Sequence, residues 1–341
     1  MWRAVALGPA ACLLTALLVP VVRRFAVTRG ITDHPKQDRW HRAPTPYLGG
    51  VAIVTAAALC LGFAPAWKMR SVVLLLAAMC VGGVGLADDL RPVPPLLRVV
   101  VEALAAAVVF FAGARTRLFG GPGDFVVTVG WIVVVTNSFN LLDNVDGALS
   151  GVGATIAVAL AFAALLNGQV LVGALAAIVA GACLGFLVHN WHPASIFMGD
   201  AGSLFLGFLL AAIGLMLRTT VAPGPSILAV LLLVGPALFD TTLVSISRMR
   251  ARRPLSVGGT DHTSHRLLLF GLSHRSMTLV LIGVSAMSAA LGAMLARGVL
   301  PALPVAVGVA TAAMAALAIL LFVPVYDRDG AAAKNVPATS P

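Results

Sequence analysis

The chain has 341 residues, of which 60% are hydrophobic and only 11% are charged. Because a water-soluble surface needs roughly a quarter of its residues to be charged, the composition excludes large soluble domains and indicates a polytopic membrane protein. The net charge of +10 does not indicate nucleic acid as a partner, since the basic residues lie beside apolar segments and lack interleaved aromatic residues for base stacking.

Eleven apolar runs approach the length of about 20 residues that a helix needs to cross a bilayer. In chain order they cover residues 4–22, 48–66, 71–87, 97–114, 125–142, 147–166, 170–188, 203–217, 226–246, 277–296 and 299–324. The sequence therefore predicts an all-α integral membrane protein, a bundle of about 11 transmembrane helices. A single multispanning domain is expected over residues 1–326, followed by a short disordered tail over residues 327–341.

Most charged residues fall on one side of these runs. Sixteen of the 23 lysines and arginines follow odd-numbered runs, and ten of the 13 acidic residues lie on the same side. Lys and Arg favour cytoplasmic loops, so the sequence predicts an amino terminus outside and these segments in the cytoplasm. Acids that formed an ion path would lie near the bilayer midplane, whereas acids gathered at one face indicate an active site facing the cytoplasm.

Asp88 and Asp89 end the third run. Adjacent carboxylates repel each other and are costly at a membrane boundary unless a cation or a proton transfer employs them. The alternative is a solvated helix end.

Asn140, Asp143 and Asp146 lie in the polar segment between the fifth and sixth runs. Their hard oxygen atoms are the ligands that Mg²⁺ prefers, together with phosphate oxygens and water. The alternative is a polar turn with Asx caps.

Asp200 lies between Gly199 and Gly202, beside Ser203, where the eighth run begins. A helix start favours phosphate binding, although Asp200 itself would repel a phosphate unless a cation intervened. The alternative is an ordinary N-cap.

The loop over residues 248–275 is rich in arginine and contains His262, His265 and Arg266. This cluster suits gripping a diphosphate, whereas a zinc site lacks a further soft ligand. Contact with anionic lipid is the other interpretation. The first loop, with Arg39 and His41, could close over an anionic substrate or simply be an anchored loop beside the membrane.

Acidic metal ligands and cationic clamps at one membrane face predict phosphoryl or pyrophosphate transfer. The chain has no G-x-x-x-x-G-K-[ST] motif, which argues against an ATPase. A transporter would place ionisable residues or broken, repeated helices at the midplane, and no internal repeat is present.

Five motifs in sequence order resemble the polyprenyl-phosphate N-acetylhexosamine-1-phosphate transferase family (glycosyltransferase family 4). They are D-H-P-x-x-x-R-x-x-H-x-x-P-x-P-x-x-G-G, the D-D pair, N-S-F-N-L-L-D-N-V-D-G, N-W-H-P-A-S-I-F-M-G-D-A-G-S-L-F-L-G-F and D-H-T-S-H-R-L, between residues 30 and 275. The resemblance implies a UDP-sugar donor, a polyprenyl phosphate acceptor in the bilayer and Mg²⁺ as cofactor, with Mn²⁺ as an alternative ion.

The resemblance also assigns roles to residues. Asp88 and Asp89 would activate the lipid phosphate, while Asp200 and Asn140 would bind the metal. The remaining expected site residues are Asp143 and Asp146 in the metal and nucleotide region, Asn190 near the nucleotide, His262, His265 and Arg266 at the sugar and diphosphate, and Arg39 and His41 in the first loop.

Three positions depart from the family pattern. Ser264 stands where H-x-H-H would have its second-to-last histidine, Arg98 stands for a lysine that often follows the aspartate pair, and Asn144 replaces a glycine. These departures leave every expected carboxylate in place, so activity is expected. The sugar that the enzyme accepts is expected to depend on the segment with His262 and His265, called the histidine loop below.

The expected reaction transfers N-acetylglucosamine 1-phosphate from UDP-N-acetylglucosamine to undecaprenyl or decaprenyl phosphate and releases UMP. It would occur at the inner (plasma) membrane and initiate a cell-envelope polysaccharide, such as a teichoic-type polymer or lipopolysaccharide. The alternative within the family is the muramoyl-pentapeptide transferase of peptidoglycan synthesis, whose members typically carry three consecutive histidines and ten spans. The small-residue patch from Gly181 to Gly185 suits either internal helix packing or a homodimer interface.

Overall fold

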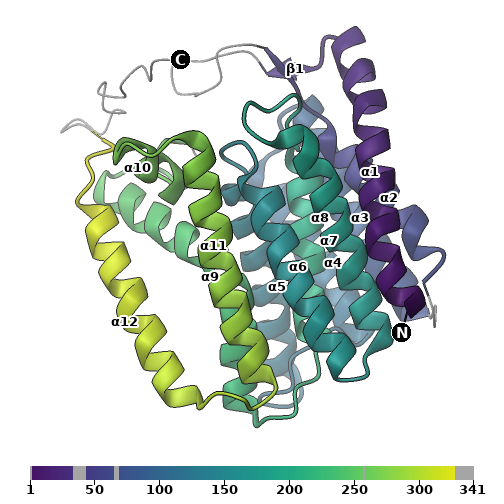
Figure 1. Ribbon diagram of the computed structural model, residues 1–341, viewed down its shortest axis with the longest axis vertical. Helices are drawn as coiled ribbons and strands as arrows, with labels where there is room; N and C mark the ends of the chain where they lie inside the picture. The colour runs from purple at the N-terminus through teal and green to yellow at the C-terminus, as the bar shows by residue number, and fades with distance from the viewer. Residues whose placement is uncertain (1, 34–43, 65–68, 256–257, 327–341) are drawn as a thin grey trace.

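The computed structural model describes residues 2–33, 44–64, 69–255 and 258–326. Its helices are α1 (Trp2–Thr28), α2 (Gly49–Leu61), α3 (Met69–Leu90), α4 (Pro95–Phe111), α5 (Pro122–Leu142), α6 (Ala148–Leu166), α7 (Val170–Asn190), α8 (Asp200–Met216), α9 (Pro223–Arg250), α10 (Thr263–Leu269), α11 (His274–Ala296) and α12 (Ala302–Leu321). Two short strands, β1 (Thr32–Asp33) and β2 (Thr45–Pro46), pair antiparallel beside the end of α1 (Figure 1).

The prediction of a helical membrane protein is confirmed. Each of the eleven apolar runs overlaps one helix, and among the described residues only the short helix α10 and the two strands were not expected. Within the described ranges, eight helices are long and apolar enough to cross a membrane, whereas α2 and α8 are shorter apolar helices. The predicted tail, residues 327–341, lies outside the described residues.

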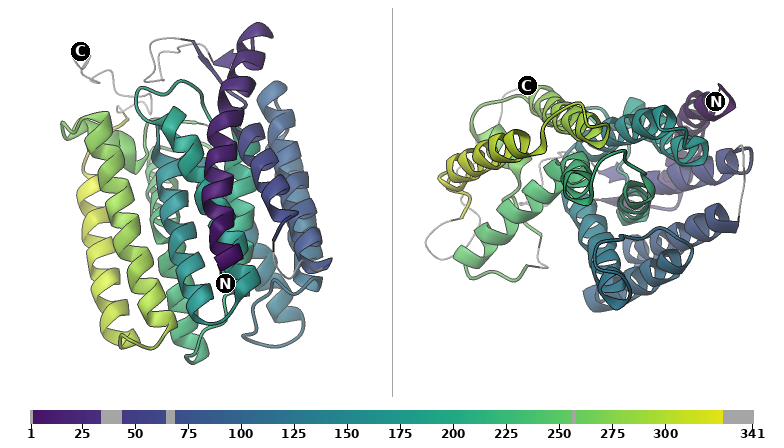
Figure 2. Two further views of the ribbon diagram at one scale, coloured as in Figure 1. Left: turned by 45° about the vertical axis from the view of Figure 1, so that its right-hand side comes forward. Right: turned by 90° about the horizontal axis from the view of Figure 1, so that it is seen from below.

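Helix α8 lies inside the bundle, which the views of Figure 2 show from the side and from below. Every residue from 201 to 214 is buried, so this helix has no face that could be covered by lipid. A helix that is apolar all round is typical of such a central position. Because the other helices pack around it, the beginning of α8 is held on several sides at once.

Helices α1 and α7 pack backbone to backbone through small residues. A Cβ atom on Gly181 would lie 1.9 Å from the carbonyl oxygen of Gly8, and one on Gly185 would lie 2.2 Å from that of Cys12. Small residues allow this close approach between membrane helices. The small-residue patch of α7 therefore serves internal packing, and a homodimer through it would have to displace α1.

Helix α12 lies at the margin of the bundle (Figure 1). Leu320 is its only buried residue, while Leu303, Val307 and Met314 are largely exposed. In a membrane, these side chains would face lipid.

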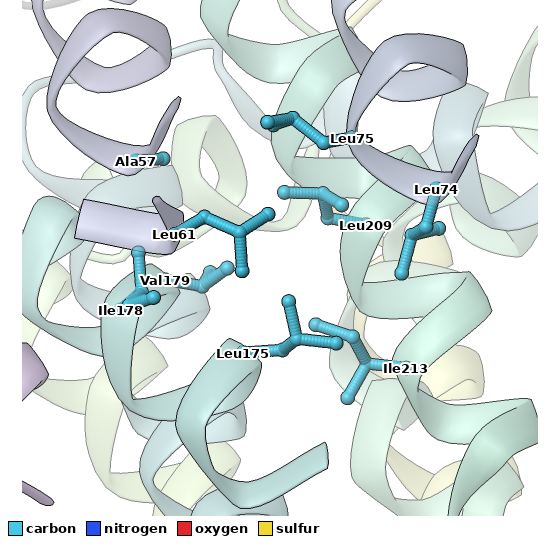
Figure 3. Close-up of a pocket in the computed structure, with 9 residues that line it drawn as sticks. All are labelled: Ala57, Leu61, Leu74, Leu75, Leu175, Ile178, Val179, Leu209 and Ile213. Atoms are coloured by element: carbon cyan, nitrogen blue, oxygen red, sulfur yellow. The ribbon is translucent and has the colours of Figure 1, made fainter. Parts of the chain in front are cut away.

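An apolar cavity of about 10 Å³ lies between α2, α3, α7 and α8 (Figure 3). Only Ala, Leu, Ile and Val side chains line it. A space of roughly one water molecule without polar partners stays dry, so this cavity is a packing gap beside the end of the short helix α2.

Candidate active site

Four helix ends meet at one end of the bundle. Asp88 and Asp89 lie in the last turn of α3, Arg98 near the start of α4, Asn140 in the last turn of α5, and Asp200 at the first residue of α8. Hydrogen bonds connect these helix ends directly. The structure thus brings together residues that are up to 112 positions apart in the sequence.

Arg98 bridges two carboxylates. Its Nη1 atom donates to Asp88 Oδ2 and to Asp200 Oδ2, each at 2.5 Å. The other oxygen of Asp88 accepts from the backbone N–H of Val93 at 2.6 Å. Asp88, which is predicted to act on the acceptor, and Asp200, the predicted metal ligand, therefore share the positive charge of Arg98.

Asn140 orients Asp200. Its Nδ2 atom donates to Asp200 Oδ1 and to Ser203 Oγ, both at 2.9 Å. The amide nitrogen, not the oxygen, faces the carboxylate, so the predicted role of Asn140 as a metal ligand requires the amide to turn over. Its observed contact is with the acid that is expected to hold the metal.

Asp89 caps helix α8 from a different helix. Asp89 Oδ1 accepts from the backbone N–H of Asp200 at 2.8 Å, and Oδ2 accepts from that of Ala201 at 3.0 Å. A carboxylate at a helix N-terminus satisfies free N–H groups and complements the helix dipole. Gly199 makes room for it, because this residue has a φ of +74° and a Cβ there would lie 2.6 Å from Asp89 Oδ2. The two adjacent aspartates therefore have different partners: Asp88 pairs with Arg98, whereas Asp89 caps α8.

Glycines clamp the beginning of α8. A Cβ on Gly50 would lie 2.2 Å from the backbone nitrogen of Gly202, and one on Gly85 would lie 2.3 Å from the carbonyl oxygen of Asp200. The backbone N–H of Gly50 donates to the carbonyl oxygen of Met198 at 2.8 Å. The glycine pair that ends the first loop thus positions Asp200 through backbone contact.

Asp143 and Asp146 differ in their surroundings. Burial, and the nearby carboxylates of Asp200 and Asp89, raise the pKa of Asp143 to about 8. Asp146 instead contacts the loop before α8, where its Oδ2 lies 2.7 Å from His192 Nδ1 and accepts from the N–H of Ala194 at 3.0 Å. Asp143 therefore belongs to the acid cluster, and Asp146 holds the loop that leads to Asp200.

Asn190 is a brace between the start of α6 and the same loop. Its Oδ1 accepts from the N–H of Gly147 at 3.0 Å and from Ser150 Oγ at 3.1 Å, and its Nδ2 donates to the carbonyl oxygen of Ile196 at 3.1 Å. The side chain is buried. These contacts are structural, and the contact with a nucleotide stays a prediction.

The histidine loop is held by an acid inside α9. His262 Nδ1 lies 2.8 Å from Asp240 Oδ2, and the N–H of Thr263 donates to Asp240 Oδ1 at 2.7 Å. The carboxylate fixes the orientation of the imidazole ring, as it does for many functional histidines. His265 is also buried, and burial together with the neighbouring His262 lowers the pKa of His265 to about 3.

Arg266 ties the loop to two helices rather than pointing outward. Its guanidinium donates to the carbonyl oxygens of Asp261, Leu320 and Val323 and to Ser247 Oγ. Only 1% of the residue is exposed. The structure thus shows a latch between α9, α10 and the end of α12, and contact with a substrate diphosphate stays a prediction.

Asp88 and Asp200 are the two carboxylates that could share a divalent cation. In the structure Arg98 Nη1 lies 2.5 Å from each carboxylate and takes the position between them, so a cation bound there would displace this guanidinium. Among the residues that the structure describes, no group of three or more acids, histidines or cysteines is placed to hold a metal. Mg²⁺ typically binds one or two protein carboxylates and takes its other ligands from phosphates and water, so two carboxylates are enough.

The family model for glycosyl transferase family 4 matches residues 71–218, which run from the first turn of α3 to just past α8. A probable undecaprenyl-phosphate N-acetylglucosaminyl 1-phosphate transferase of Bacillus subtilis is 34% identical over 280 residues, covering 77% of this chain and 77% of the relative. The chain belongs to glycosyl transferase family 4.

Two further relatives show the range of the similarity. A decaprenyl-phosphate N-acetylglucosaminephosphotransferase of Mycobacterium tuberculosis is 33% identical and covers 79% of this chain and 76% of its own. A phospho-N-acetylmuramoyl-pentapeptide-transferase of Synechococcus is 34% identical and covers 62% of this chain and 66% of its own. This family 4 protein is therefore a phospho-sugar transferase in a membrane.

Within this family 4 transferase, two predicted residues, Arg39 and His41, lie outside the described residues. Sequence reasoning missed the bridging role of Arg98 and the support that Asp240 gives to His262. Each had a signal: Arg98 is the only basic residue of α4, and Asp240 is one of few acids within an apolar run.

Proposed function

We propose that this transferase moves N-acetylglucosamine 1-phosphate from UDP-N-acetylglucosamine to polyprenyl phosphate and releases UMP, in a reaction that requires Mg²⁺ or Mn²⁺. The observation that carries the proposal is the shared contact of Asp88 and Asp200 with Arg98 at one end of the bundle. The names of the relatives from Bacillus subtilis and Mycobacterium tuberculosis support this donor and acceptor class.

The residues would divide the work as follows. Asp200, oriented by Asn140 and faced by Asp88, would hold the metal ion, whose charge would offset that of the donor diphosphate. Asp89 is committed to capping α8, so we assign Asp88 to the acceptor phosphate. Arg98 supplies a fixed positive charge where two phosphates must meet despite their repulsion.

The proposed reaction forms one phosphorus–oxygen bond and breaks another. An oxygen of the acceptor phosphate forms a bond to the sugar-linked phosphorus, and the bond from this phosphorus to the UMP oxygen breaks. The acceptor proton passes to Asp88, and the products are UMP and a polyprenyl diphosphate sugar.

The placement in the membrane is part of the proposal. We propose eleven crossings, an amino terminus outside and a site that faces the cytoplasm at the plasma membrane. The excess of Lys and Arg in the connections on the side of Asp88 and Asp200 supports this orientation. The lipid-linked sugar would begin a cell-envelope polysaccharide.

UMP release by the purified chain tests the proposal. Release from UDP-N-acetylglucosamine is expected to need both polyprenyl phosphate and Mg²⁺ and to disappear in Asp200→Asn, with an unchanged melting temperature showing that the variant folds. Release only from the UDP-muramoyl-pentapeptide donor would favour the peptidoglycan enzyme, and release only from UDP-N-acetylgalactosamine would change the sugar. No release with all three donors would contradict the proposal.

A further inference from the structure

A pocket with two arginines lies at the end of the bundle opposite to Asp200. It is built on the connection between α4 and α5, which follows the last residue of α4, whereas Arg98 lies in the first turn of that helix. A helix of 17 residues spans about 25 Å. The pocket is therefore not an extension of the candidate active site.

Hydrogen bonds hold this connection in one conformation. Asp124 Oδ1 accepts from the N–H groups of Leu118 and Phe119 at 2.7 and 3.0 Å, and Oδ2 accepts from that of Gly120 at 3.1 Å. Thr116 donates its N–H to Thr128 Oγ1 at 3.0 Å. Asp124 therefore holds the connection through these backbone N–H groups, and its carboxylate also interacts electrostatically with Arg115.

The cavity measures about 620 Å³, within the range of small-molecule sites. Phe110, Phe111 and Phe125 form one aromatic cluster with ring centroids 5.2 to 6.1 Å apart. The guanidinium of Arg115 lies over the ring of Phe110, 5.6 Å from its centroid. We call this the arginine pocket; its lining residues are Phe110, Phe111, Arg115, Arg117, Gly120, Gly121, Pro122, Asp124 and Phe125.

Among the residues that line the pocket, Asp124 is the one acid, and its carboxylate accepts the three backbone N–H groups described above. Arg115 and Arg117 are exposed, and Arg70 Nη1 lies 3.4 Å from the position that a Cβ on Gly113 would take. In the described connections at this end (62–64, 112–121, 167–169, 217–222 and 297–301) there is no acidic residue. Basic residues are disfavoured on the non-cytoplasmic side, so the two exposed arginines that line this pocket favour an anionic ligand under the proposed orientation.

We propose that the arginine pocket binds the headgroup of an anionic phospholipid, with its phosphodiester between Arg115 and Arg117 and the start of an acyl chain against the phenylalanine rings. Arginine pairs well with phosphate oxygens, and basic pockets between membrane helices bind anionic headgroups. The exposed apolar side chains of Val108 and Leu104 continue from Phe111 along α4 and offer a surface for the rest of the chain. This binding does not depend on the transferase reaction.

The test uses the full chain in neutral detergent and measures the melting temperature during titration with phosphatidylglycerol, phosphatidylcholine or inorganic phosphate. Phosphatidylglycerol is expected to stabilise the wild type, and Arg115→Gln/Arg117→Gln should lower its apparent affinity more than tenfold, since hydrogen bonds to charged groups are each worth about 1.5–3 kcal/mol. The matched control, Arg218→Gln/Arg297→Gln, removes two exposed arginines from the same end and should keep the wild-type affinity.

Three results would overturn the proposal: equal affinity in both double variants, the same stabilisation by phosphatidylcholine, or the same stabilisation by inorganic phosphate alone. If the double variant does not fold, the single variants Arg115→Gln and Arg117→Gln decide. Each is expected to weaken phosphatidylglycerol binding, and wild-type affinity in both would reject the pocket.

Discussion

Ser264 donates a hydrogen bond to Asn144 Oδ1 at 2.5 Å, across 120 positions of the sequence. Asn144 also donates from its Nδ2 to the carbonyl oxygen of Leu141 at 2.7 Å. Ser264 and Asn144 are two of the three positions at which the motifs depart from the usual family pattern of histidine and glycine. The two departures therefore form one contact, which ties the histidine loop to the polar segment that carries Asp143.

A double-mutant cycle on Asn144→Ala and Ser264→Ala tests this contact. We expect each single change to lower the free energy of unfolding by about 1 kcal/mol, and the pair to cost less than the sum, because either change removes the same hydrogen bond. Additive losses would show that the two side chains are independent.

A second test of these positions uses the assay of UMP release. The double variant Asn144→Gly/Ser264→His should shift the ratio of kcat/KM between UDP-N-acetylglucosamine and UDP-N-acetylgalactosamine.

Two substitutions of Arg98 should show whether activity requires its positive charge or only the size of its side chain. Arg98→Gln is expected to lower kcat/KM by roughly 10- to 150-fold, the equivalent of about 1.5–3 kcal/mol for a hydrogen bond to a charged group. Arg98→Lys keeps the charge and should recover most of the loss. Equal activity of the glutamine and lysine variants, measured by UMP release, would show that the positive charge is not required.

The two members of the aspartate pair should respond differently to substitution. Asp89→Ala removes the cap of α8, so we expect a loss of about 0.5–2 kcal/mol of stability together with lower activity. Asp88→Asn should abolish most activity and change the melting temperature less, since the amide oxygen can still accept from Val93. The comparison of melting temperature and UMP release for both variants checks this division, and identical profiles would contradict it.

His265 should make stability depend on pH below neutrality. The pKa of His265 is lowered to about 3 by burial and by His262, whereas an unfolded histidine titrates near 6.5. The unfolded chain therefore binds more protons between these values, and stability falls as the pH is lowered through this window, by at most about 1.4 kcal/mol per pH unit. Melting temperatures between pH 7 and pH 5 should decline less steeply in His265→Gln than in the wild type; parallel slopes would assign the effect to other groups.

The sequence predicted the helices well because a membrane helix depends on local apolar length. It also predicted which polar side chains lie together, since Asp88, Asn140 and Asp200 all lie at helix ends on one side. The partners of individual atoms could not be predicted. Asp88 and Asp89 are neighbours with the same side chain, yet Asp89 caps α8 whereas Asp88 pairs with Arg98 of α4. The contacts of Arg266 with the end of α12 and of Asn190 with the start of α6 could not be predicted either, because each joins residues at least 40 positions apart. Their roles at the substrate stay predictions.

Arg98 has a consequence for how this protein is made. Arg98 is a counter-ion for Asp88 and Asp200 that belongs to the polypeptide itself. We therefore expect the helices to assemble in the membrane without a bound metal ion. Many metal sites behave otherwise, because folding and metal binding are coupled. Treatment with a chelator is therefore expected to stop UMP release while leaving the melting temperature almost unchanged, and readdition of Mg²⁺ should restore turnover without refolding. A melting temperature that falls steeply on chelation would show that Arg98 does not replace the ion in holding the fold.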